Sequence, residues 1–598
     1  MTGGFVGGSG TLNFVSKWTP NGVTIGNSQI FDDGTNVGIN ISTSLGAKLH
    51  VKGAGNTSAT FGFRVDSSTV SNLFYVRNDG AVSSLNGYWI GSEKIFYINP
   101  NGTTANIFIG DSSGNSTLTG GTNTALGSNT LSSITSGSFN IAFGYQALRN
   151  ITSGSYCVAI GSQSLAYNSI SDSNTAIGYR ALFSSTASQN TAIGAYAIGS
   201  GAAGALNTAI GYNCMYGALV GASNNVAIGV SVFSGGSFAG AYNVGIGNSV
   251  GTSVTTGSEN VIIGYSALKS NTTASFNVAV GSNALRDNTT GASNVAIGRE
   301  SMIVNTTGNG SVGIGLSALS GNTTGGFNVA IGQQSKISGA ASDYTVSVGY
   351  QSAYSSTGSN DTAIGAFAMK QKTTGNNNAV FGYDALSSYV GGYSNNTVVG
   401  ASAMGSATTK LGNNVAIGFQ AMYNNESAAI VGIGYRVLYA NTTGEHNTAL
   451  GYEASRFNTT GSFNTALGKS ALYTNVSGSE SIAIGYQALY TATGNYNTAV
   501  GTNAGGGITT GTENTIIGRS SVNSGLTTGS KNTIVGASTA VTNAADSGCV
   551  ILGYGATATG NNQFVVGSAT TNAGAITAEV VVSDETWTVI INGVQKKI

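Results

Sequence analysis

The chain has 598 residues, of which 91 are Gly and only 7% are charged. Its 22 basic and 22 acidic residues balance, which excludes an electrostatic nucleic-acid binder, because such proteins need a basic face for the phosphates. Three Cys and two Pro exclude a disulfide framework and a collagen helix. A Gly-rich, charge-poor chain with 40% hydrophobic residues is typical of a repeat architecture.

The first hundred residues contain short apolar segments but no repeat. The start, residues 1–8, has neither a basic region nor an apolar core of a secretory signal, and no segment reaches 18 uninterrupted apolar residues. We therefore expect no membrane insertion and assembly in a cytoplasm. Residues 1–100 are predicted to form a β-rich attachment region, in which residues 28–40, 47–51 and 74–82 resemble the β-rich modules near the start of many phage fibre proteins.

A repeat begins near residue 101 and continues to about residue 570. Pentapeptides such as Asn123–Gly127, Asn294–Gly298 and Asn464–Gly468 end in a Gly that recurs 28 times at a mean spacing of about 17 residues. No window has the 3.6-residue apolar period of a helix. Two short strands and two turns in each unit predict one coil of a parallel β-roll or β-solenoid, giving an all-β shaft of about 28 coils.

Each position of the repeat has a physical interpretation. The residue before the Gly is always Ile, Leu, Val or Phe, so we expect it to be buried in a strand. The residue before that is mostly Ala, which predicts a face that allows close approach of a partner chain. Four residues before the Gly, Asn occurs in 20 of the 28 units. Stacked amides hydrogen-bond along such a column, and the predicted structural ladder includes Asn123, Asn140, Asn174, Asn294 and Asn464.

One coil buries too little to be stable alone. Its two large apolar side chains contribute on the order of 4–6 kcal/mol, whereas ordering 17 residues costs on the order of 25 kcal/mol. Ladders between neighbouring coils recover part of this difference, and the thin core favours an oligomer. We therefore expect an intertwined homotrimeric fibre. Residues 571–598, which include the apolar segments 576–582 and 587–591, are predicted to form a C-terminal β cap.

Tyr is the one recurrent residue with a binding interpretation. It often follows the repeat Gly, where stacked phenols form either a platform for sugars or a purely structural aromatic ladder. The surface candidates are Tyr145, Tyr179, Tyr265, Tyr383 and Tyr486.

Other chemistry has weaker support. Gly313-Ile-Gly315 fits part of a dinucleotide fingerprint but is a variant of the repeat without a following helix. Cys157, Cys214 and Cys549 fall on repeat positions and are interpreted as buried structural thiols. We expect no cofactor, no metal site within one chain and no enzymatic activity. An axial ring of His50 or His446 from three chains, and a glycan-cleaving carboxylate pair, are the alternatives; the carboxylates considered are Asp32, Asp33, Glu426, Glu445 and Glu453.

The unit Asn-x-Ala-Ile-Gly-x-x-Ala-Leu resembles the head repeats of bacterial trimeric autotransporter adhesins, and this resemblance implies a left-handed β-roll in a trimer. The longer form in residues 447–464, with its Asn-Thr-Thr-Gly turn, is more similar to bacteriophage tail-fibre repeats. The signal peptide, coiled-coil stalk and membrane barrel of the adhesins are not visible, which favours the fibre.

The resemblance implies a structural and adhesive virion fibre that contacts a host surface glycan or protein. It implies as partners two further copies of the chain and other virion or baseplate proteins, with assembly in the host cytoplasm. Two alternatives stay open: a non-viral extracellular adhesin or filament subunit, and a fibre-borne polysaccharide depolymerase.

Overall fold

The described part of the chain is built from short β-strands joined by turns, with no helix. The computed structural model describes residues 106–567, except 116, 203, 372–373, 389–390, 393 and 408–411, together with strands β1–β9 before this range and β43–β44 after it. Two compact units, residues 1–242 and 243–598, divide the chain, so the predicted shaft 101–570 belongs to both. Each unit is described by itself.

The predicted attachment region contains two antiparallel arrangements. Strands β1–β7 pair in sequence order in one sheet, with bounds Phe14–Trp18, Ile25–Asp32, Asn36–Ile39, Lys48–Lys52, Phe61–Asp66, Phe74–Arg77 and Val82–Ser83. Strands β8 (Tyr88–Ile90) and β9 (Glu93–Asn99) form a hairpin, and β9 pairs antiparallel with β10 (Asn106–Ile109), the first strand of the repeat. This hairpin covers the backbone edge that a parallel stack otherwise leaves unpaired.

The first unit continues as a stack of parallel strands, one in each coil. Each strand pairs with the next without a register shift, as in Ala125↔Ala142 and Ala142↔Ala159. After β10 the strands are β11 Thr124–Leu126, β12 Ile141–Phe143, β13 Val158–Ile160, β14 Thr175–Ile177, β15 Thr191–Ile193, β17 Thr208–Ile210 and β19 Val226–Val230.

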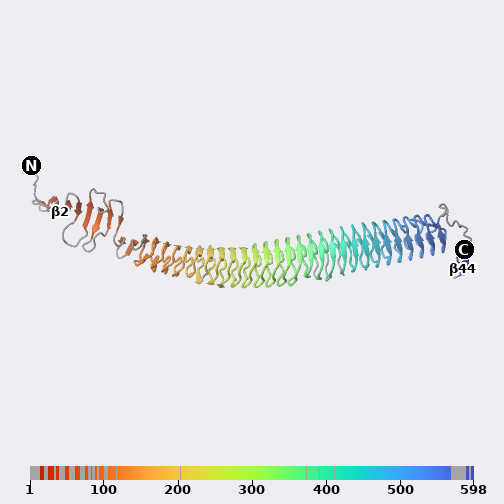
Figure 1. Cartoon of the computed structure of the whole chain (residues 1–598), viewed down its shortest axis with the longest axis horizontal. Helices are drawn as coiled ribbons and strands as arrows, with labels where there is room; N and C mark the ends of the chain where they lie inside the picture. Colours follow the sequence, from red (N-terminus) through yellow and green to blue (C-terminus); the bar gives the residue numbers. More distant parts are fainter. Residues whose placement is uncertain are drawn as a thin grey trace, which may run out of the picture. The chain divides into compact units, whose positions relative to one another are not determined.

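The second unit contains a longer stack of the same kind, drawn from green to blue in Figure 1. Its strands are β21 Val244–Asn248, β22 Val261–Tyr265, β23 Val278–Val280, β24 Val295–Ile297, β25 Val312–Ile314, β26 Val329–Ile331, β27 Val346–Val348, β28 Thr362–Ile364, β29 Ala379–Phe381, β30 Thr397–Val399, β31 Val415–Ile417, β32 Val431–Ile433, β33 Thr448–Leu450, β34 Thr465–Leu467, β35 Ile482–Ile484, β36 Thr498–Val500, β37 Thr515–Ile517, β38 Thr533–Val535, β40 Val550–Leu552 and β42 Phe564–Val566. A separate hairpin, β43 (Thr588–Ile591) and β44 (Val594–Lys597), lies within the predicted cap, whereas residues 576–582 lie outside the described residues.

The predicted parallel β-solenoid with a period of about 17 residues is confirmed, and no described residue is helical. The eight stacked strands of the first unit enclose seven complete turns, and the twenty of the second unit enclose nineteen. The two stacks therefore hold about 26 complete turns, whereas the sequence predicted about 28 coils. The prediction of two strands per coil is wrong for most coils. Among the described residues, the second strands are β16 Ser200–Ala202, β18 Ala218–Val220, β20 Ser237–Phe238, β39 Ala540–Val541 and β41 Thr557–Ala558.

Most coils replace the second strand with a series of corners. In the coil that starts at Asn277, non-Gly residues adopt the left-handed conformation at Asn283 (φ 58°), Leu285 (φ 50°) and Ser293 (φ 59°). Such φ values are uncommon for residues with a Cβ, above all for Leu. Backbone hydrogen bonds to the next coil persist between them, for example from Leu285 N–H to Ser301 O at 3.0 Å. These hydrogen bonds between coils stabilise the left-handed conformation of the corner residues, which differs from the extended conformation of a strand.

The orientation of the short strand is opposite to the prediction. In most coils the residue in the middle of the strand is an Ala that is fully buried inside its own coil, as at Ala279 and Ala296. The residue before the Gly points outward, and Leu126 and Ile297 are 48% and 38% exposed. Some coils hold a larger buried residue at the inward position, such as Ile262 or Ile516, so Ala is the usual occupant of the inside but not a requirement.

The Gly at the end of each strand is required for two separate reasons. Gly298 has φ of +129°, which residues with a side chain rarely adopt, and a Cβ there would lie 2.5 Å from the carbonyl oxygen of Gly315 in the next coil. The same relation joins Gly281 to Gly298. The Gly column therefore sets both the bend and the close approach between coils.

Candidate binding surface

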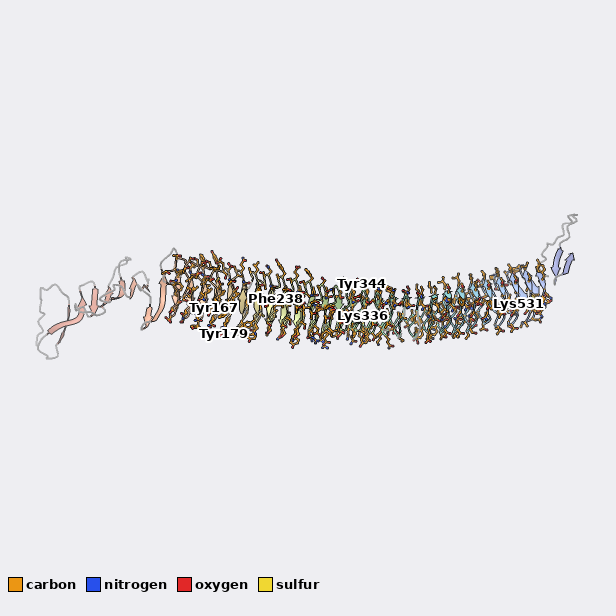
Figure 2. The ribbon with its side chains drawn as sticks, turned by 90° about the horizontal axis from the view of Figure 1, so that it is seen from below. Tyr167, Tyr179, Phe238, Lys336, Tyr344 and Lys531 are labelled. Atoms are coloured by element: carbon orange, nitrogen blue, oxygen red, sulfur yellow. The ribbon has the colours of Figure 1, made fainter. Side chains whose placement is uncertain are left out.

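The five Tyr candidates lie where the repeat predicts, directly after the strand Gly, and all are exposed by between 42% and 59%. They do not form a continuous tyrosine ladder. In the first unit Tyr145 is followed one coil later by Ser162, and Tyr179 instead meets Tyr196 edge-on at 5.3 Å. Figure 2 labels Tyr179 among the side chains of this unit. In the second unit Tyr265 and Tyr383 have a Ser and an Ala in the next coil.

Of the five candidates, Tyr486 alone belongs to a continuous row of large side chains. In five successive coils the residue after the Gly is Phe419, Tyr435, Tyr452, Lys469 and Tyr486, which we call the first row. The ring centroids of Phe419 and Tyr435 are 5.5 Å apart and those of Tyr435 and Tyr452 are 4.8 Å apart, with nearly parallel planes. The Lys469 ammonium then lies 5.3 Å from the Tyr452 centroid and 5.9 Å from that of Tyr486.

A second row runs beside the first, four residues further along each coil. It consists of Tyr423, Tyr439, Arg456, Tyr473 and Tyr490. Tyr423 stacks on Tyr439 at 5.3 Å and Tyr473 on Tyr490 at 5.0 Å, both nearly parallel. Each row therefore consists of stacked rings with one cation inserted at the third or fourth place, an arrangement that cation–π attraction stabilises.

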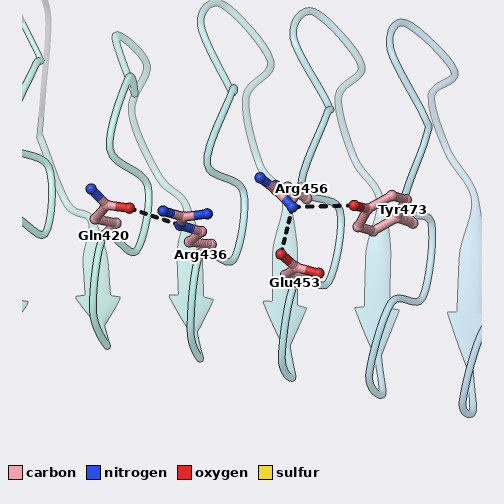
Figure 3. A network of polar contacts seen from close by, with 5 residues as sticks. All are labelled: Gln420, Arg436, Glu453, Arg456 and Tyr473. Atoms are coloured by element: carbon pink, nitrogen blue, oxygen red, sulfur yellow. Dashed lines mark hydrogen bonds and ion pairs between the residues drawn. The ribbon is translucent and has the colours of Figure 1, made fainter.

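Charged side chains lie among the two rows, and Figure 3 shows the polar contacts of Arg436 and Arg456. The Arg436 guanidinium lies 5.2 Å from the Tyr435 centroid and 5.7 Å from the Tyr439 centroid, and its Nε donates to Gln420 Oε1 at 2.8 Å. Arg456 Nη1 donates to Glu453 Oε1 at 2.5 Å and to the Tyr473 hydroxyl at 3.2 Å. Partial burial, and then the nearby Tyr473 and Glu453, raise the pKa of Tyr490.

The stacking determines which part of each ring faces solvent. Parallel rings about 5 Å apart cover each other's faces, so the rows present ring edges and phenol hydroxyls rather than open faces. Phe139–Tyr156 and Phe327–Tyr344 stack in the same way elsewhere, and Figure 2 labels Tyr344. A platform on which sugars stack face to face therefore does not exist within the rows, whereas a line of hydroxyl donors does.

The predicted Asn positions are buried within their coils. Asn140 donates from its amide and from its backbone N–H to Asn123 Oδ1, both at 3.0 Å, and Asn174 donates to Ala187 O at 3.1 Å. Asn294 and Asn464 donate instead to the carbonyl oxygens of Gly308 and Gly478, each at 2.8 Å. The column thus consists of amides that accept from the next backbone and donate either along the column or across the coil.

A second amide column, which was not predicted from the sequence, lies in the turns. Asn288, Asn305 and Asn322 are buried. The Asn305 amide donates to Asn288 Oδ1 at 2.8 Å, and the Asn322 amide donates to Asn305 Oδ1 at 3.1 Å. Asn425, Asn441, Asn458 and Asn475 form a similar column. The signal was present in the recurrent Asn-Thr-Thr-Gly turns, where a buried Asn satisfies the carbonyl of the Gly three residues later.

The three cysteines are buried free thiols, as expected. Cys157 and Cys549 occupy the Asn column, where their backbone N–H groups donate to Asn140 and Asn532. Burial raises the pKa of the Cys157 thiol from 9.0 to about 11 and also raises that of Cys214. Neither thiol has the lowered pKa of a reactive cysteine.

The remaining candidates are not brought together into a site. His446 lies on the surface and stacks on Phe463 at 4.9 Å, while the side chain of His50 and Asp33 lie outside the described residues. Among the described residues, no three His, Cys, Asp or Glu side chains gather as metal ligands. Glu453 is paired with Arg456, and Gly313 occupies the inward Ala position of β25.

Comparisons with known proteins leave the family open. No protein-family model matches the sequence, and no curated protein matches it significantly. Within the described part of the chain, no helix is both long and apolar enough to cross a membrane.

Proposed function

We propose that the chain is one subunit of a homotrimeric virion fibre, a phage tail fibre that contacts a glycan or protein on the host surface. The observation that carries this proposal is the outward face of the stacked strands. Its two columns, the residue after the column Asn and the residue before the Gly, contain no charged residue in any of the 28 strands.

This strand face is apolar and unusually regular. In the second unit the residues before the Gly include Ile297, Ile331, Leu450 and Leu467, which are 38% to 45% exposed. Burying what remains of such a side chain contributes on the order of 1 kcal/mol. This gain in free energy recurs in every coil, so the total gain for a long stack is large. Monomeric proteins rarely expose continuous apolar surface of this extent, and a second copy of the chain offers a surface with the same 17-residue period.

Three copies follow from the resemblance of the repeat to adhesin heads. Each coil is flat and apolar on its strand side, so three chains can place these sides around one axis and leave the turns outside. The turns carry the charged residues and the two rows. A virion fibre must then expose these turns to the host, which assigns adhesion to the turn surface rather than to the strand face.

The oligomeric state is tested by substitution on the strand face. The double variant Ile297→Lys/Ile331→Lys puts a charge in two coils, and Val476→Lys changes a residue in the turn that is exposed to a similar extent, 46%. We expect light scattering to give the mass of three chains for the wild type and Val476→Lys, and a lower mass for the double variant. A monomeric wild type would contradict the proposal.

The location is tested on particles. Antibodies raised against the purified chain are expected to label fibres attached to phage tails in electron micrographs. Labelling of cell-surface filaments in the absence of phage would instead support the non-viral adhesin. Shortening of a host polysaccharide by the purified chain would support the depolymerase.

A further inference from the structure

The double row of residues 419–490 combines features that the rest of the turn surface has only in part. We propose that it is a binding site for a linear acidic polysaccharide, laid along the stack with its sugars following the coils. This inference rests on the proposed adhesive function and assigns it to one place and one class of ligand.

Charge is the first argument. Across the five coils the turn surface that carries the rows holds Arg436, Arg456 and Lys469 against a single carboxylate, Glu453. Arg456 is paired with that carboxylate at 2.5 Å. Within the described residues, no carboxylate pairs with Arg436 or Lys469. The chain as a whole is neutral, so these two cations, which lie two coils apart on an aromatic surface, form a local excess that favours an anionic ligand.

The position of the acidic residues supports the same conclusion. The other carboxylates of these coils are Glu426, Glu445 and Glu480. None of them belongs to the segment between the strand Gly and the second row, and Glu445 and Glu480 lie in the turn that leads into the next strand. Apart from Glu453, which is paired with Arg456, the segments that carry the rows therefore hold no carboxylate.

Orientation of the side chains is the second argument. Arg436 uses Nε for Gln420, and its guanidinium lies 5.2 Å and 5.7 Å from the Tyr435 and Tyr439 centroids, which leaves its two terminal NH2 groups outside that hydrogen bond. Lys469 is held between two rings. Both cations are therefore positioned before a ligand arrives, which lowers the entropy that binding costs. Carboxylates bind to such groups by charge-assisted hydrogen bonds.

Spacing is the third argument. Taken together, the two rows place at least one tyrosine in each of the five coils. The ring centroids of stacked neighbours are about 5 Å apart, as the Tyr435–Tyr452 and Tyr473–Tyr490 distances show. The sugars of an extended polysaccharide repeat at nearly the same interval, so a chain along the stack meets equivalent donors in successive coils. A ligand that must stack on open ring faces, such as single-stranded nucleic acid, finds those faces covered.

The experiment measures binding of the full-length protein to polygalacturonate, with neutral dextran and single-stranded DNA as comparisons. The test variant is Arg436→Gln/Lys469→Gln. The matched control is Lys269→Gln/Lys531→Gln, which removes the same charge from exposed lysines outside the rows; Figure 2 labels Lys531. Tyr435→Phe/Tyr452→Phe removes two hydroxyls and retains the rings.

We expect saturable binding of polygalacturonate and none of dextran. The cation variant should bind about tenfold or more weakly, because it loses two charge-assisted hydrogen bonds to carboxylates of the ligand. The control should stay within about twofold, and the phenylalanine variant should lie between. Equal loss in test and control variants, equal binding of dextran, or tighter binding of DNA would overturn the proposal.

Adsorption to host cells separates this inference from the proposed function. If the chain binds polygalacturonate through the double row but does not adsorb to any host, the host-attachment function fails and the site remains. If the chain adsorbs to cells and the cation variant adsorbs and binds equally well, the site is wrong and the function remains.

Discussion

The side-chain oxygen of Asn277 accepts the backbone N–H of Asn294, one coil further along, at 2.9 Å. The same bond recurs from Asn294 to the backbone N–H of Ser311 at 2.9 Å. Each side-chain amide therefore adds one hydrogen bond between neighbouring coils to those of the backbone ladder of the strands. Because the groups are fully buried, a missing partner cannot be replaced by water.

Substitution at this column should be costly. Asn294→Leu leaves the backbone N–H of Ser311 without its amide partner, and a buried unpaired group costs about 1–3 kcal/mol, whereas the carbonyl of Gly308 keeps its bond from Asn305. We expect a loss of about 1–3 kcal/mol in the free energy of unfolding, measured by denaturant titration. Thr290→Leu, at an exposed turn position of the preceding coil, is the control and should change stability by less than about 0.5 kcal/mol.

The turn column should be nearly as sensitive. The sequence alone suggests that Asn305 is less important than Asn294, because it lies in a turn. In the structure Asn305 is buried, donates to Asn288 and Gly308, and accepts from Asn322. We therefore expect Asn305→Leu to cost about as much as Asn294→Leu. A cost close to that of Thr290→Leu would contradict the second amide column.

A methyl group on the Gly column should disrupt the stack. Gly298→Ala requires φ of +129° and puts a Cβ 2.5 Å from Gly315 O, with no flexible side chain to move away. We expect a loss of more than about 3 kcal/mol. Gly236 also has positive φ, +63°, but its Cβ would have nothing within 4 Å. Gly236→Ala therefore measures the cost of φ alone, about 1 kcal/mol, and similar midpoints for the two variants would refute the close approach.

The period, the bend and the packing order differ in how well the sequence predicts them. The Gly spacing predicts the coil because each Gly meets a local requirement, namely a bend with positive φ and close approach to the next coil. The orientation of Ala279 and Val280 is a different matter, because alternation fixes only that the two face opposite ways. Which one faces inward depends on what lies across the interior, as at the equivalent position Gly313, where a Cβ would lie 2.9 Å from Met302 Cγ of the preceding coil. No local pattern reveals such a contact.

The left-handed corners are hidden in the sequence for another reason. Positions equivalent to Leu285 are occupied by Leu, Met, Phe, Val and even Lys336, and all have φ near 50°. The residue type at this position therefore does not reveal the left-handed conformation, because hydrogen bonds to the next coil impose that conformation. Lys336, which Figure 2 labels, is buried at such a position and donates to Ser356 O at 2.8 Å. The double row is likewise visible only once the coils are stacked.

Stability should fall at high pH because of the buried thiols. The pKa of Cys157 is about 11 in the folded chain and near 9.0 when burial is lost. Above pH 9 the unfolded chain therefore binds fewer protons, so the free energy of unfolding decreases as pH rises from 9 to about 11. The contribution of Cys157 is about 2–3 kcal/mol. Cys157→Ser, which puts at this position a residue that the column has at Ser311, should show a smaller decrease, and parallel pH profiles would contradict the assignment.

The last prediction concerns removal of one whole coil. Each coil contacts only its neighbours, so deletion of residues 277–293 joins Asn294 to Phe276 and re-forms the same interface. The junction is conformationally matched, because Phe276 and Ser293 precede their column Asn with φ of 63° and 59°. Ala279 pairs with Ala296 in the native register, and after the deletion Ala296 should take its place against Ile262.

We expect the deletion variant to fold, to have the same number of chains and to lose about 4.8 Å in length, one strand spacing. Deletion of only residues 277–284 removes the strand and leaves its turns, which places Leu285 where the neighbouring coils present a strand. This shorter deletion should prevent folding or lower the denaturation midpoint severely. Circular dichroism, light scattering and electron microscopy measure these outcomes, and equal tolerance of both deletions would refute the stacked-coil architecture.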